Sequence, residues 1–139
     1  MKILQIAPLW ASVPPKAYGG TELVVSKLTD GQVKNGQDVT LFASGDSKTK
    51  AKLKTYVDKA LGVSVESGKM TTEKVTKNEV MLNSEAFREA NNYDIIHAHT
   101  SYLGSAFANF VMTPTVMTLH YYPTGPELEI MRKSKAQFV

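Results

Sequence analysis

Two groups of side chains in this sequence have the types and spacing that chemistry requires. The first lies in the segment PPKAYGGTE, Pro14 to Glu22, where the glycine pair Gly19 and Gly20 is followed closely by the carboxylate of Glu22. Glycines allow a ligand to approach the backbone, and the free N–H groups at the start of a helix carry partial positive charge. This combination suits a phosphate or a sugar hydroxyl, although two glycines can also serve only to turn the chain.

The second group consists of the histidines. His97 and His99 lie two residues apart in DIIHAHT, and His120 closes TVMTLH. Side chains two apart on a strand point to the same face, so the first two imidazoles could share one ligand. Zinc would require a further protein ligand, often a carboxylate, and we therefore expect no metal here. The alternative for each histidine is that it satisfies buried polar groups at a strand end.

The elements that position these residues alternate along the chain. Apolar runs predict strands at 2–7, 38–43, 94–99 and 115–120, and 136–139 resembles the opening of another buried strand, cut off after a few residues. Helical patterns are present at 21–36, 79–91, 103–111 and 126–135, and a basic helix is expected within 47–59. The stretch 62–76 is expected to be a short strand with irregular polar chain. Candidate buried positions on the helices at 21–36 and 79–91 are Leu23, Val24, Leu28, Val33, Val80, Met81, Phe87 and Ala90.

Alternating strands and helices of this kind predict an α/β fold, a Rossmann-like doubly wound parallel sheet covered on both faces. In such a sheet ligands bind at the carboxyl ends of the strands. We therefore expect the glycine segment, His99 and His120 at one edge of the sheet.

The composition excludes several classes of protein. The chain has 139 residues, no cysteine and a net charge of +3, which fit one domain (1–139) without disulfides or thiolate metal sites. The N-terminus does not resemble a signal peptide, so a cytoplasmic location is expected. The lysines of the segment from Lys48 to Lys59 form either a solvated helix face or a peripheral contact with anionic lipid or a phosphorylated substrate. They are not interleaved with arginines or exposed aromatics, so no nucleic-acid partner is expected.

These segments also resemble a known family. PPKAYGGTE, followed by a helix and then KNGQDVTLFASGDS, resembles the N-terminal domain of the group 1 retaining glycosyltransferases, which have the GT-B fold. DIIHAHT and PTVMTLH fall where that family has its D-x-x-H-x-H and T-x-H segments. The resemblance runs from Lys2 to about His120.

The resemblance implies one half of a two-domain enzyme that transfers a sugar from a nucleotide-sugar donor to an acceptor, without a cofactor. Gly19 and Gly20 would approach the donor phosphate and the transferred sugar, with Glu22 in the same motif. His120 would contact the transferred sugar near the reaction centre. The acceptor side would be lined by His99 and Thr100.

The sequence departs from the family pattern at three points. Tyr121 stands where the family usually has glycine, and Gln32 where an apolar helix residue is common. The donor half of the family carries an E-x7-E pair of carboxylates and a basic pair for the diphosphate, and no two glutamates of this chain are eight positions apart. The chain is therefore expected to be an acceptor domain that lacks the C-terminal nucleotide-sugar domain and is inactive alone.

Three other functions are compatible with parts of the sequence. A nicotinamide-dependent oxidoreductase domain would need a tight glycine turn and an acidic residue closing the second strand, which are absent. A metal-dependent hydrolase using His97 and His99 lacks further ligands. A non-catalytic small-molecule binding module differs from the leading interpretation only in whether a donor domain follows.

Overall fold

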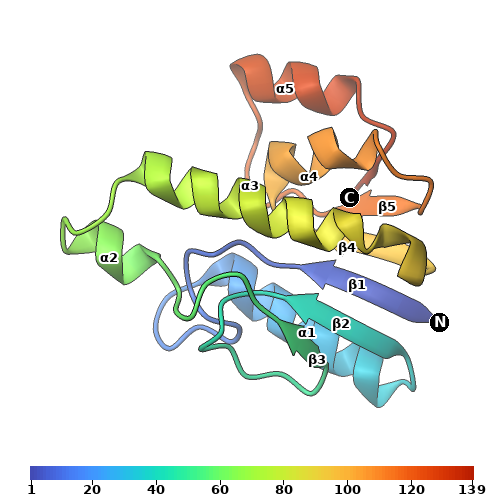
Figure 1. The fold of residues 1–139 in the computed structure, drawn as a ribbon, viewed down its shortest axis with the longest axis horizontal. Coiled ribbons are helices and arrows are strands. Elements are labelled where there is room, and N and C mark those ends of the chain that lie inside the picture. The colour runs from blue at the N-terminus through green and yellow to red at the C-terminus, as the bar shows by residue number, and fades with distance from the viewer.

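The computed structural model describes residues 1–139 and consists of one parallel sheet flanked by helices (Figure 1). The strands are β1 (Lys2–Ile6), β2 (Asp38–Phe42), β3 (Lys52–Lys54), β4 (Ile95–Ala98), β5 (Thr115–Met117) and β6 (Gln137–Phe138). The helices are α1 (Gly20–Lys34), α2 (Gly62–Glu66), α3 (Thr72–Arg88), the short 3-10 turn η1 (Ala90–Asn92), α4 (Ser101–Ala108) and α5 (Gly125–Arg132). No helix is long and apolar enough to cross a bilayer.

The sheet has six strands in the order β3-β2-β1-β4-β5-β6, and every neighbouring pair is parallel. The chain moves outward from β1 to β3 and then returns to place β4 on the other side of β1. This reversal creates a switch point between β1 and β4, outside whose carboxyl ends open α/β sheets form their ligand crevice. The predicted doubly wound, Rossmann-like α/β fold is confirmed.

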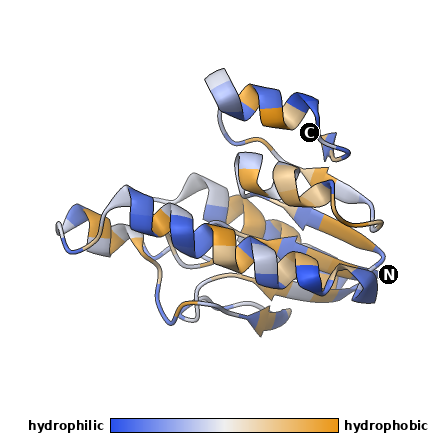
Figure 2. Cartoon of the chain, turned by 45° about the horizontal axis from the view of Figure 1, so that its top comes forward, coloured by the Kyte–Doolittle hydropathy of each residue, from blue (hydrophilic) through white to orange (hydrophobic).

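The core has two layers because the central strands bury side chains on both faces. The larger cluster packs β1, β4 and β5 against α3 and α4 and includes Leu4, Ile96 and Leu82, all fully buried. The smaller one lies toward α1 and includes Val25 and Leu41. Figure 2 shows the same arrangement, with apolar ribbon concentrated in the strands and mixed polarity along the helices. The near-continuous apolar strands follow from burial on both faces.

The helices α1 and α3 are rotated relative to the stripes expected from sequence. Leu23 and Val24 are each 47% exposed, and the buried side of α1 instead carries Val25 and two small polar residues. The packing favours small side chains because they let the helix approach the sheet closely. On α3, Val80 and Met81 are exposed instead of buried. The helix begins earlier, at Thr72, and its inner face follows Val75, Leu82, Ala86 and Phe87. Phe87 and Ala90 are buried as predicted.

Two expectations for the middle of the chain are wrong. The segment 47–59 is not a helix: Lys52–Lys54 forms the strand β3, in register with Thr40–Phe42 of β2. Lysine occurs at every second position from Lys48 to Lys54, a pattern typical of an edge strand. The prediction of a helix rests on apolar residues in the same segment, which also recur at helical spacing. The stretch 62–76 contains the helices α2 and the start of α3 instead of a strand. Because no helix is present at 47–59, the predicted lipid contact has no helical lysine face and stays a prediction.

The ends of the later elements also differ. β5 stops at Met117, three residues before His120, so this histidine lies on the chain that follows the strand. β6 is a strand as predicted but is exposed, because it forms the outer edge of the sheet beside β5. Gly36, with φ of 81°, ends α1 at the expected position.

Candidate functional site

The exits of β1, β4 and β5 lie at one edge of the sheet, because these strands are parallel neighbours. The exit of β1 leads into the loop that ends at the glycine pair, β4 leads directly to His99, and β5 leads to His120. The predicted grouping at one edge is confirmed. The first two exits flank the switch point between β1 and β4.

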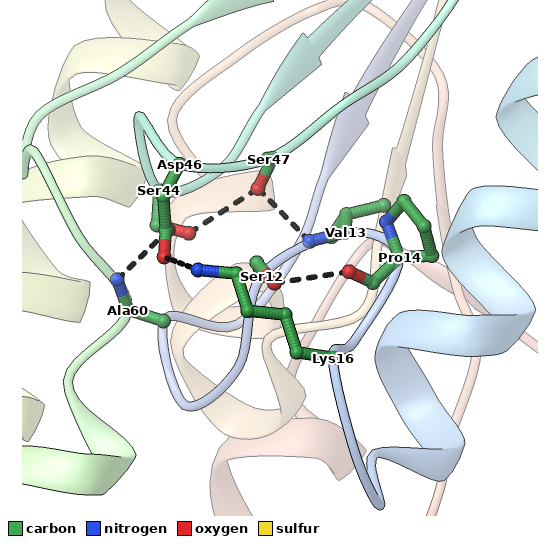
Figure 3. A network of polar contacts seen from close by, with 8 residues as sticks. All are labelled: Ser12, Val13, Pro14, Lys16, Ser44, Asp46, Ser47 and Ala60. Carbon is green, nitrogen blue, oxygen red and sulfur yellow. Dashed lines mark hydrogen bonds and ion pairs between the residues drawn. The ribbon is translucent and has the colours of Figure 1, made fainter.

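The loop after β1, residues 7–19, is held against the loop after β2 (Figure 3). The Val13 N–H donates to Ser47 Oγ at 2.9 Å, and the Lys48 N–H donates to the Val13 carbonyl at 2.7 Å. Lys16 pairs with Asp46 at 3.4 Å, and the Val13–Pro14 peptide is cis. The segment LFASGDS, noted in the sequence only for its resemblance, therefore serves to anchor the glycine loop.

Asp46 links the two loops to the segment before α2. Its Oδ1 accepts the Ala60 N–H at 3.0 Å and its Oδ2 accepts from Lys16. Burial alone would raise the pKa of Asp46, but the hydrogen bonds from Ser44, Ala60 and Lys16 outweigh burial and lower the pKa. The carboxylate thus stays charged where it braces the loop.

Two glutamates brace the same loop from opposite helices. Glu22, at the start of α1, is 4% exposed and its Oε1 accepts the Ala11 N–H at 3.1 Å. From α3, Glu79 Oε1 accepts the Leu9 N–H at 3.0 Å. Burial raises the pKa of Glu79, the Leu9 N–H opposes this, and nearby Glu22 adds to the rise. Glu22 therefore holds the backbone of the loop that ends at the glycine pair.

The two glycines face different surroundings. A Cβ on Gly19 would lie 2.7 Å from Pro15 Cβ, so only glycine fits there. Nothing lies within 4 Å of the position that a Cβ on Gly20 would occupy. Neither residue lies in the left-handed region of φ, since Gly19 is extended with φ of 177°, and the requirement for glycine at Gly19 is close packing. Gly20 opens α1, whose first N–H groups have no side-chain cap, and the space beside the Gly20 Cα is open.

The three imidazoles form one array across β4 and β5. The rings of His97 and His99 stack with centroids 4.4 Å apart, as expected for one face of a strand. His99 Nδ1 lies 2.9 Å from His120 Nε2, and His97 Nε2 lies 2.7 Å from Thr118 Oγ1. On its other side, His99 Nε2 lies 3.2 Å from the Oε1 of fully buried Gln5.

The surroundings keep these rings neutral. Burial, with the adjacent rings of His97 and His120, lowers the pKa of His99 to about 3. Burial likewise lowers the pKa of His97 and of His120. No group of three or more His, Cys, Asp or Glu side chains is arranged to hold a metal ion. The array is suited to hydrogen bonding by neutral imidazole.

Thr100 and Tyr121 complete the edge. Thr100 is buried and its hydroxyl donates to Asn83 Oδ1 of α3 at 2.8 Å. The Tyr121 hydroxyl contacts Ser101, which has φ of 55°, and donates to Glu127 of α5 at 3.0 Å. The phenol therefore ties the chain after β5 to the starts of α4 and α5. Tyr121, at the position where the resemblance noted above implies glycine, thus adds a hydrogen-bonded aromatic side chain at this edge.

Sequence reasoning missed several residues of this site. Gln5, Glu79 and Asn83 carry no motif, and their roles depend on contacts between distant segments. A buried glutamine within an otherwise apolar strand was the one available signal. Gln32 is the residue noted above as a departure from the family pattern. Its Oε1 accepts a hydrogen bond from Gln5 Nε2 at 2.9 Å.

Comparisons with known proteins agree with this fold. The family description Glycosyltransferase Family 4 matches residues 18–137. Among solved structures, the chain is similar to AviGT4, a glycosyltransferase involved in avilamycin A biosynthesis, with a TM-score of 0.56 and 23% identity. The match covers 99% of this chain and 41% of AviGT4, so the chain spans less than half the length of that protein.

At this identity the likeness to AviGT4 shows the fold alone. No curated protein matches the chain. The family match, however, covers most of the sequence and includes the glycine pair and all three histidines. The chain therefore belongs to Glycosyltransferase Family 4 and is a Rossmann-like domain of the GT-B architecture.

Proposed function

We propose that residues 1–139 form the acceptor-side domain of a retaining glycosyltransferase, which transfers a sugar from a nucleotide-sugar donor to an acceptor. The observation that carries this proposal is the convergence of open backbone at Gly20 and neutral imidazole at His120 on one sheet edge. A second α/β domain of the same protein would bind the nucleotide and close the cleft.

The donor phosphate would lie at the start of α1. The first N–H groups of this helix have no side-chain cap, and the position beside Gly20 is open. Leaving-group departure from a nucleotide diphosphate builds negative charge on phosphate, which helix N–H groups stabilise. The packed Gly19 and the carboxylate of Glu22 would hold the loop in the conformation that exposes these groups.

The transferred sugar would lie beside His120, with His99 and Thr100 toward the acceptor side. Positive charge develops on the sugar ring during transfer, so a neutral imidazole is better suited than a cation to this position. Since the hydroxyl of Thr100 is bonded to Asn83, we assign Thr100 to shaping the acceptor side rather than to proton transfer.

The test is His120→Ala in the complete enzyme. We expect kcat to fall by on the order of 10²-fold, the scale of one positioned polar group, because the contact acts where charge develops. The KM for the acceptor should change far less. A matched control is Met112→Ala, since Met112 is 90% exposed on the chain that precedes β5, at the opposite edge of the sheet. If His120→Ala lowers the melting temperature but leaves the folded fraction fully active, His120 has only a structural role.

A second test uses the 139-residue chain alone. The basic pair and the E-x7-E carboxylates are absent from it, so we expect neither hydrolysis of nucleotide sugars nor transfer. Turnover by the purified chain, retained after removal of contaminants, would contradict the assignment of the donor site to a second domain.

A further inference from the structure

Four side chains form a continuous hydrogen-bonded row that runs from α1 across β1 and β4 to the chain after β5. Gln32 on α1 meets Gln5 on β1 at 2.9 Å, and Gln5 meets His99 after β4 at 3.2 Å. His99 meets His120 after β5 at 2.9 Å. Gln5 is fully buried and His99 is 4% exposed, so water does not replace the contact between these two side chains.

The row has a defined direction. The Nε2 of Gln5 donates to Gln32 Oε1, so its Oε1 is the atom turned to His99. An amide oxygen can only accept, and therefore the proton of His99 is on Nε2. Because His99 is neutral, its Nδ1 is bare and accepts. The partner at 2.9 Å, Nε2 of His120, must then carry a proton.

We infer that Gln32 and Gln5 are positioning residues that fix His120 in the Nε2–H tautomer and leave its Nδ1 as a hydrogen-bond acceptor. Nδ1 has no partner within the chain, whereas Nε2 is engaged with His99. The ligand group that suits a bare imidazole nitrogen is a donor, such as a sugar hydroxyl, and not a phosphate oxygen. The link to the substrate rests on the proposed function, but the tautomer does not.

The tautomer is measurable in the 139-residue chain. Long-range ¹H–¹⁵N correlation spectra at pH 7 distinguish protonated from bare ring nitrogens, and we expect His99 and His120 each to show a single Nε2–H form. Gln32→Glu keeps an acceptor opposite Gln5 and should preserve both forms. Gln32→Leu removes that acceptor, frees the Gln5 amide to reverse, and should cause the loss of the single tautomer at His99.

A matched control is Gln37→Leu, the same replacement just beyond the end of α1, at a side chain whose oxygen has no partner. It should leave both tautomers unchanged. An Nδ1–H form of His99 in the unaltered chain, or spectra of Gln32→Leu identical to those of the unaltered chain, would overturn the inference. Gln32 and Gln37 are both only partly buried, so we expect the variants at these positions to fold.

Activity of the complete enzyme separates this inference from the proposed function. Gln32→Leu should lower kcat by on the order of 10-fold with little change in KM. Gln32→Glu should keep the kcat of the unaltered enzyme. A changed tautomer with unchanged kcat would support the row of hydrogen bonds and refute the role of His120 in transfer. An unchanged tautomer refutes the row whatever the activity.

Discussion

Acidification should destabilise the domain through His99. Its imidazole is 4% exposed, and its pKa falls from the ordinary value of 6.5 to about 3 because of burial, with the adjacent rings of His97 and His120 adding to the fall. In the unfolded chain the same ring takes up a proton near pH 6.5. Between these values the unfolded state binds more protons than the folded state, so stability is lost as the pH falls.

The magnitude follows from the two pKa values. Each pH unit between them costs about 1.4 kcal/mol of folding free energy. At pH 5 the loss amounts to about 2 kcal/mol, and it stops growing below about pH 3, where the folded ring also becomes protonated. A loss of this size is a large part of the stability of a small domain.

The assay is urea unfolding of the chain and of His99→Asn at pH 7, 6 and 5. Asparagine does not titrate, so the difference in pH dependence between the two proteins isolates His99. The unfolding free energy of the unaltered chain should fall relative to the variant by about 2 kcal/mol between pH 7 and pH 5, or about 1 M in urea midpoint. Parallel pH profiles would refute the reasoning, and so would an NMR titration in which His99 protonates near pH 6.

Three substitutions test the packing that positions the site, each by chemical unfolding. Thr29→Val should leave stability unchanged or raise it by up to about 1 kcal/mol, because the buried Thr29 hydroxyl has no partner; a clear loss would reveal a hidden hydrogen bond. Gly104→Ala should cost about 1–3 kcal/mol, since its Cβ would lie 2.8 Å from Met117 Cε and 3.0 Å from Ala98 Cβ. Gly31→Ala, at a helical position with nothing within 4 Å, should stabilise by about 0.5–1 kcal/mol, and equal effects at the two glycines would contradict the packing argument.

The sequence by itself determined the central strands and the edge of the sheet at which the glycine pair and the histidines lie. Strands β1 and β2 are short, mostly apolar runs that are buried on both faces beyond their first residue, and strand is the structure that such a short run favours. Because the strands are parallel, their carboxyl ends meet at one edge, and the glycine pair, His99 and His120 are predicted there without reference to any tertiary contact. The segments where local signals conflicted, such as 47–59, were assigned wrongly because the pairing of β3 with β2 outweighed an apparent helical spacing.

Only the tertiary structure decided what each polar group of the site contacts. Gln5 and His99 are 94 residues apart in sequence, and they meet because β1 and β4 pair in one register. The rotation of α1, which turns Gln32 inward and Leu23 outward, is likewise set by packing against the sheet. Periodicity records which face of a segment is buried, but the partner of a buried donor or acceptor depends on the register and rotation of elements that are distant in sequence.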